Sequence, residues 1–176
     1  MTRLTTIQPL GEAVDHVRGP ATGPVILEYG DYECPYARLA FHEIELVRRR
    51  LSGDVRFAFR HFPLTGVHPH ALAASAAAEA AALQNEFWNM HALLFHGQAA
   101  LEEDDLRRYA DELALDVAVF DDDRGSTRVR ERVHRDVESG IASGEVLGTP
   151  TLFIDGVLHE GHYDVPSLLN ALAGRT

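Results

Sequence analysis

The sequence predicts an α/β fold whose elements follow the order β-α-β, a helical insertion, and then β-β-α. Two apolar runs typical of strands flank one helical pattern in the N-terminal part of the chain. Helical patterns then fill residues 66–146, and strand patterns and one last helix follow them. The 176 residues, 45% of them hydrophobic and 24% charged, suit one globular domain with a sizeable core.

A loop rich in proline and glycine, RGPATGP at 18–24, divides the chain into two parts. We expect residues 1–19 to form an N-terminal arm and residues 20–174 to form a single domain. The short apolar run VILEY at 25–29 predicts the first strand of this domain, in a buried position.

A helix is predicted over 35–51, because apolar residues recur along one side of this segment. Arginines at 48–50 fall in its last turns, where the helix dipole favours cations. The segment VRFAFRHF at 55–62 alternates between its two faces and predicts a second strand. Strand, helix and strand in this order imply a parallel pair joined by a right-handed crossover.

The insertion and the C-terminal part complete the predicted order. Amphipathic helices are predicted in the insertion at 71–83, 85–95, 102–113 and 126–141. The segment GTPTLFIDGVLHEG at 148–161 then predicts a strand at 151–155, a tight turn at Asp155-Gly156 and a short second strand. The final helix is predicted at 164–174.

The segment YECPYARLA at 32–40 places the single cysteine of the chain at the start of the first helix. We expect Cys34 to cap this helix and Pro35 to be its first residue, because the fixed φ of proline suits that position. The unpaired N–H groups and the positive dipole end of a helix start stabilise a thiolate over a thiol. Cys34 is therefore a candidate nucleophile, and the alternative is an inert cysteine buried as a small hydrophobic residue.

Several motifs stand in a characteristic order along the chain. They are EYGDYECPY at 28–36, FRHFPL at 59–64, HPHA at 68–71 and GTPTLFIDG at 148–156. Together with the helical insertion, they resemble the DsbA-like branch of the thioredoxin superfamily, over about residues 20–174. The resemblance implies a thioredoxin-like fold and a thiol–disulfide oxidoreductase or isomerase in which Cys34 is catalytic.

The resemblance also implies roles for residues around Cys34. The Thr149-Pro150 bond is expected to be cis and to lie against the sulfur, because only X-Pro bonds adopt cis at low cost. The backbone of Thr149 would then pair with an extended substrate beside the sulfur. Pro35, Tyr36, Thr149 and Pro150 are therefore the expected substrate-binding residues.

Glu28 is the second candidate catalytic residue. It lies in the middle of an apolar strand, where a carboxylate is costly unless it is paired or protonated. In the family, an acid at this position lies near the active site, which implies a pKa raised by burial and a role in proton exchange with the thiol. The alternative is a glutamate at a strand edge that faces solvent. Asp31 and Glu33, nearer in sequence, are expected to be solvated loop charges.

Ala37 stands where a Cys-Pro-x-Cys protein carries its second, resolving cysteine. A chain with one thiol can attack a disulfide, but an external thiol must then resolve the product. Three hypotheses follow. Cys34 works alone with glutathione or another thiol as co-substrate; Ala37 is an inactivating replacement in a dithiol oxidoreductase; or the chain is a redox-inactive module that binds an extended peptide or a partner protein.

The net charge and the absence of certain sequence patterns restrict the expected partners and location of the protein. The net charge of −11 argues against nucleic acid and against an anionic membrane surface as partners. We expect protein or small-molecule thiols and disulfides as partners and no bound cofactor. The absence of an N-terminal secretory pattern and of an internal disulfide predicts a cytoplasmic setting.

The ten histidines raise the question of a metal site. The candidates are the HPH segment at 68–70 and the pair His159 and His162. Zinc sites need three or four convergent ligands, usually at recognisable spacing, and neither group has this pattern. The sequence therefore predicts no metal site, and it places His68 and His70 in a loop near Cys34.

Overall fold

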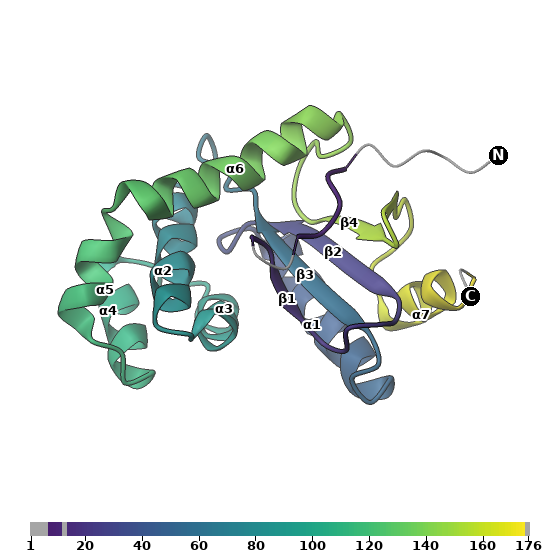
Figure 1. Cartoon of the computed structure of the whole chain (residues 1–176), viewed down its shortest axis with the longest axis horizontal. Helices are drawn as coiled ribbons and strands as arrows, with labels where there is room; N and C mark the ends of the chain where they lie inside the picture. Colours follow the sequence, from purple (N-terminus) through teal and green to yellow (C-terminus); the bar gives the residue numbers. More distant parts are fainter. Residues whose placement is uncertain (1–6, 12–13, 175–176) are drawn as a thin grey trace.

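The computed structural model describes residues 7–11 and 14–174, and it confirms the predicted fold class. A five-stranded sheet in the order β1-β3-β2-β4-β5 forms the centre of the molecule (Figure 1). The parallel pair predicted from the sequence is β2 beside β3, and the other neighbouring strands are antiparallel. The strands are β1 (His16–Arg18), β2 (Val25–Gly30), β3 (Arg56–His61), β4 (Thr151–Ile154) and β5 (Val157–Leu158).

The strand β1 lies in the segment that the sequence assigned to an N-terminal arm. It pairs with β3, with His16 opposite Phe59, so the sheet begins before residue 20. Its three residues are too few to give an alternating pattern, so the sequence places the start of the sheet after residue 20. Residues 1–6 and 12–13 of the expected arm lie outside the described residues.

The helix α1 (Pro35–Arg50) connects β2 to β3 and begins where the sequence predicts. Its buried side consists of Ala37, Ala40, Phe41, Ile44 and Val47. The last helix, α7 (Val165–Ala173), packs against α1, and the side chain of Asp164 caps it by accepting from the N–H of Ser167. The larger hydrophobic core lies on this face of the sheet, between the strands and the helices.

The insertion between β3 and β4 holds five helices, which are α2 (Ala71–Leu83), α3 (Phe87–His96), α4 (Glu103–Glu112), α5 (Val117–Arg124) and α6 (Thr127–Ser143). Helices α2 to α5 gather at one side of the sheet, and the long α6 runs from this group back toward the strands (Figure 1). The sequence predicted four of the five. It missed α5, which has only eight residues and one buried side chain, Phe120, so its apolar periodicity is weak.

The C-terminal part of α6 packs on the second face of the sheet. Gly140 lets the helix approach closely, because a Cβ there would lie 2.9 Å from the Phe62 ring and 3.2 Å from the Tyr29 ring. The hydroxyls of Tyr29 and Ser139 are hydrogen-bonded at 2.8 Å. No helix in the described part of the chain is long and apolar enough to cross a membrane.

Candidate functional site

Cys34 is the N-terminal cap of α1, and Pro35 opens the first turn, as the sequence predicts. The Cys34 N–H donates to the carbonyl oxygen of Asp31 at 3.1 Å, so the chain turns sharply between β2 and the helix. No side chain caps this helix start. The positive end of the helix dipole therefore acts on the cysteine itself, of which only 3% is exposed.

The loop before β4 lies against this cysteine. The Thr149-Pro150 peptide bond is cis, and the Cys34 Sγ lies 3.3 Å from the carbonyl oxygen of Thr149, to which the thiol can donate. The Thr149 hydroxyl is buried and has no hydrogen-bond partner among the described residues. The structure thus brings together Cys34, Thr149 and Pro150, three of the predicted site residues.

A hollow of about 350 Å³ adjoins the Thr149-Pro150 loop and is lined in part by Tyr163 and Leu158. Burial of Tyr163, and then the nearby Cys34, raise the pKa of the Tyr163 phenol. Two large apolar side chains are exposed around the site: Leu147 at 90% and Tyr36 at 61%. The surface beside the sulfur therefore has space, apolar area and backbone polar groups, which are the features that an extended peptide uses.

Glu28 lies in the middle of β2, between Phe59 of β3 and Leu152 of β4. Its side chain is completely buried, so the alternative of a solvent-facing edge glutamate is wrong. Burial raises the pKa of Glu28 to about 8, although the Arg18 cation acts in the opposite direction. Neither carboxylate oxygen has a hydrogen-bond partner among the described residues, so Glu28 makes no direct hydrogen bond to Cys34.

Ala37 is completely buried on the side of α1 that faces the core. Residues three apart share a helix face, so this side chain lies on the same side of the chain as Cys34. A second sulfur at this position would lie beneath the first. With alanine there, the site contains one thiol, and the chain has no other.

The expectation that Asp31 is a solvated loop charge is wrong, because none of its surface is exposed. Its carboxylate accepts hydrogen bonds from the N–H of Glu33 and the N–H of Leu64, each at 2.8 Å. The Nδ1 of His68 lies at the same distance from it. Asp31 therefore ties the turn before Cys34 to the loop after β3.

Glu33 is partly buried and binds His70. It accepts from the His70 N–H at 2.7 Å, and the His70 Nδ1 lies 2.9 Å from its other oxygen. Burial opposes the ionisation of Glu33, but the hydrogen bonds from His70 outweigh it and lower the pKa of Glu33. The structure thus places His68 and His70 next to the Cys34 turn, as the sequence predicts, and gives each a carboxylate partner.

Two further residues shape the site without a sequence signal. The Gln98 side-chain amide, which belongs to the insertion, donates to the carbonyls of Tyr32 and Cys34 at 2.8 and 2.9 Å. Tyr32 is completely buried, and its hydroxyl is hydrogen-bonded to the Nδ1 of His91 at 2.9 Å. Both residues link the Cys34 turn to the helical insertion. Their hydrogen-bond partners are more than fifty residues away in sequence, so no local pattern reveals these contacts.

Comparisons with known proteins agree with this arrangement. The family described as "Thioredoxin" matches residues 12–173. The structure is similar to that of a thioredoxin-like oxidoreductase from Silicibacter pomeroyi, with a TM-score of 0.81 and 24% identity over 93% of each chain. It is also similar to alpha-DsbA1 of Wolbachia pipientis, with a TM-score of 0.78 and 19% identity over 94% of this chain and 92% of that one. At these identities the similarity establishes the fold.

A curated relative is closer in sequence but much longer. A protein of Mycolicibacterium vanbaalenii named Na(+)/H(+) antiporter NhaA 1 is 43% identical over 176 residues. The match takes in 98% of this chain and 28% of the relative. The chain therefore corresponds to one part of that longer protein.

Proposed function

The chain belongs to the thioredoxin family and has the fold of its DsbA-like members, and from this we propose that it is a thiol–disulfide oxidoreductase that uses Cys34 as its sole sulfur nucleophile. One observation carries the proposal. The single cysteine of the chain caps α1 and lies 3.3 Å from the carbonyl of Thr149 in a cis X-Pro loop. The helix start supplies the stabilisation of a thiolate that nucleophilic attack needs.

The proposed cycle has two exchanges. The Cys34 thiolate attacks a substrate disulfide, a bond forms between Cys34 and one substrate sulfur, and the other substrate sulfur leaves as a thiolate. A second thiol, such as glutathione, then attacks the mixed disulfide, takes the substrate sulfur and regenerates the Cys34 thiolate. The electrons balance, since each step forms one S–S bond and breaks one, and the external thiol is the reductant.

The neighbouring residues have positioning roles in this proposal. The backbone of Thr149 pairs with an extended substrate, and Pro35, Tyr36 and Pro150 flank the substrate sulfur. Glu28, with a pKa of about 8, exchanges protons with the site near neutral pH, through groups or water between it and the sulfur. Neither role needs a bound cofactor.

The supply of the second thiol restricts where the cycle can run. A compartment with a pool of free thiols, as in the cytoplasm, provides glutathione for the second exchange. The activity in the name of the longer relative is not carried over, because most of that protein lies outside the matched part.

The direct test is reduction of a glutathione mixed disulfide, with excess glutathione as the second substrate. We expect steady turnover by the wild type, none by Cys34→Ser, and rates that rise with glutathione concentration. The Ala37→Cys variant is the matched comparison. It restores a resolving thiol. Once added oxidised glutathione has closed the disulfide between the two cysteines, the variant is expected to oxidise dithiol substrates, which the wild type cannot do because one thiol forms no internal disulfide.

A second candidate function rests on the hollow beside Thr149 and the exposed Leu147 and Tyr36. In this alternative the site binds an extended peptide or partner and Cys34 has no redox role. Absence of turnover in both the wild type and Ala37→Cys, together with alkylation of Cys34 at the rate of a free thiol, would favour this binding module over the oxidoreductase.

A further inference from the structure

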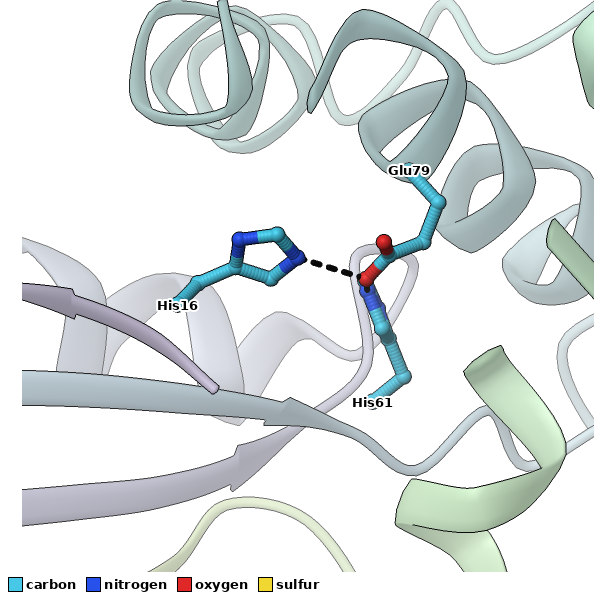
Figure 2. A group of neighbouring side chains, drawn as sticks. All are labelled: His16, His61 and Glu79. Carbon is cyan, nitrogen blue, oxygen red and sulfur yellow. Dashed lines mark hydrogen bonds and ion pairs between the residues drawn. The ribbon is translucent and has the colours of Figure 1, made fainter. Parts of the chain in front are cut away.

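Two histidines and a glutamate meet outside the Cys34 turn. His16 comes from β1, His61 from the end of β3 and Glu79 from α2, and Figure 2 shows all three directed at one point. The Nε2 of His16 lies 2.8 Å from Oε1 of Glu79, and the Nε2 of His61 lies 2.7 Å from the same oxygen. The ligand atoms of the three side chains are all within 4.8 Å of one another.

Both imidazole rings are held in this orientation by Phe87. His16 stacks on the Phe87 ring at 3.5 Å between centroids, and His61 meets the same ring edge-on at 6.1 Å. The side chain of His61 is completely buried, and those of Glu79 and His16 are 6% and 19% exposed. The three groups are therefore arranged before any ligand arrives, which lowers the cost of binding one.

A cavity of about 530 Å³ opens onto the cluster and is lined by His16 and Glu79, among others. It gives a route from solvent and room for a water molecule next to His16 and Glu79. Arg132 lies beside the cluster, with its Nε 3.8 Å from Oε1 of Glu79, and its guanidinium is paired at a shorter distance, 2.6 Å, with Asp136. Two imidazoles and a carboxylate around an accessible space form a common set of protein ligands for a metal ion.

We propose that His16, His61 and Glu79 bind one divalent first-row transition ion, with zinc as the reference, through both Nε2 atoms and Oε1, and with water in the fourth position. Zn–N and Zn–O bonds of about 2.0–2.2 Å place tetrahedral ligands about 3.3 Å apart. Each Nε2 therefore moves away from Oε1 by roughly half an ångström when the ion takes the place of the hydrogen-bonded protons. A neutral imidazole then carries its proton on Nδ1, and any further proton passes to solvent. The nitrogen ligands favour this class of ion over magnesium or calcium.

The prediction from sequence that the chain has no metal site considered other histidines, namely the HPH segment and His159 with His162. The sequence gives no signal for this cluster, because His16 and Glu79 are 63 residues apart and His61 and Glu79 are 18 residues apart. These spacings match no metal-binding motif. Only the pairing of β1 with β3, and the packing of α2 beside them, bring the ligands together.

The test titrates zinc chloride into metal-free Cys34→Ser protein by calorimetry, so that the thiol cannot bind the ion. Cobalt(II) is added in a parallel titration, because its visible spectrum reports a four-coordinate site. We expect one ion per chain, and an affinity at least about tenfold weaker in His16→Gln and in Glu79→Gln. The control His134→Gln changes an exposed histidine on α6 and should bind as tightly as the parent.

His16→Gln is the decisive variant, because His16 is partly exposed on an edge strand and its replacement is compatible with the fold. Circular dichroism of each variant establishes that it is folded. Failure of the folded parent to bind zinc would overturn the proposal. Equal binding by the parent and His16→Gln would overturn it as well, since the three groups would then be only a hydrogen-bonded link between β1, β3 and α2.

Discussion

At the scale of single residues, the position of Cys34 decides what the chain can do. Its N–H is used by the turn at Asp31, its carbonyl accepts from Gln98, and its sulfur meets Thr149. The sulfur is thus fixed at the positive end of a helix by contacts with three separate segments. Ala37 supplies no second thiol and is compatible with all these contacts, so it limits the proposed reaction cycle rather than the arrangement of the site.

Glu28 makes the stability of the protein depend on pH. Its pKa rises from an ordinary value of 4.5 to about 8 on folding. The folded state therefore prefers the neutral acid. The stability that Glu28 contributes is fully present below pH 4.5 and is lost as the pH rises through 8. We expect the wild type to lose on the order of 4 kcal/mol of unfolding free energy between about pH 5 and pH 9 from this group.

The Glu28→Gln variant keeps the shape of the neutral acid but cannot ionise. We expect its unfolding free energy, measured by urea denaturation, to lack the fall that Glu28 causes over this range and to exceed that of the wild type at pH 9. A wild type whose stability follows the same pH profile as Glu28→Gln would contradict a buried acid with a raised pKa.

Gln98 tests whether the insertion positions the nucleophile. Gln98→Ala removes two hydrogen bonds to the Tyr32 and Cys34 carbonyls, which we expect to cost about 1–3 kcal/mol and to slow alkylation of Cys34. The matched control is Gln84→Ala, because the Gln84 amide also makes two hydrogen bonds, to the backbone of Asp116. Equal alkylation rates in the two variants would mean that Gln98 has only a structural role.

At the scale of elements, β1 is held to the sheet by a buried ion pair. Arg60 of β3 donates to both carboxylate oxygens of Asp15 at 2.9 Å, and the two side chains are almost fully buried. Arg135 of α6 also reaches Asp15, at 3.2 Å. The segment before β1 is therefore linked to both the sheet and the insertion.

Asp15→Asn is expected to destabilise the protein by about 3–5 kcal/mol, because it leaves the Arg60 cation buried without a counter-charge. The control Arg107→Gln removes an exposed pair with Asp121 and should cost no more than about 1 kcal/mol. Thermal or urea unfolding of both variants measures this difference. A loss for Asp15→Asn as small as that for Arg107→Gln would show that the pair does not hold β1 in place.

Most elements were predictable because local patterns determine them. β3 and α1 follow from periodicity, β2 follows from a short apolar run, and α2 follows from a run of small residues that favour a helix. The Asp155-Gly156 turn follows from residues that adopt positive φ, which both do here. β1 was missed because its three residues are too few to show alternation. α5 was missed because one buried phenylalanine gives no apolar periodicity. Their formation depends on partners that are distant in sequence.

At the scale of the whole molecule, the site also combines residues that local motifs predict with contacts that form only between distant parts of the chain. Cys34, Pro35, Thr149 and Pro150 carry motifs and were predicted in place. The burial of Asp31 and Tyr32 and the contacts of Gln98 were not predictable, because they arise where the insertion folds back on the Cys34 turn. The cluster of His16, His61 and Glu79 likewise exists only in the assembled fold.

The central claim is that this fold activates one thiol and leaves its resolution to another molecule. Intact-mass spectrometry of the protein after addition of oxidised glutathione tests it most directly. We predict one glutathione adduct per chain, at Cys34, formed faster than on a free cysteine, persistent when the oxidant is removed and lost when glutathione is added. No adduct, or an adduct formed no faster than on a free cysteine, would contradict the claim.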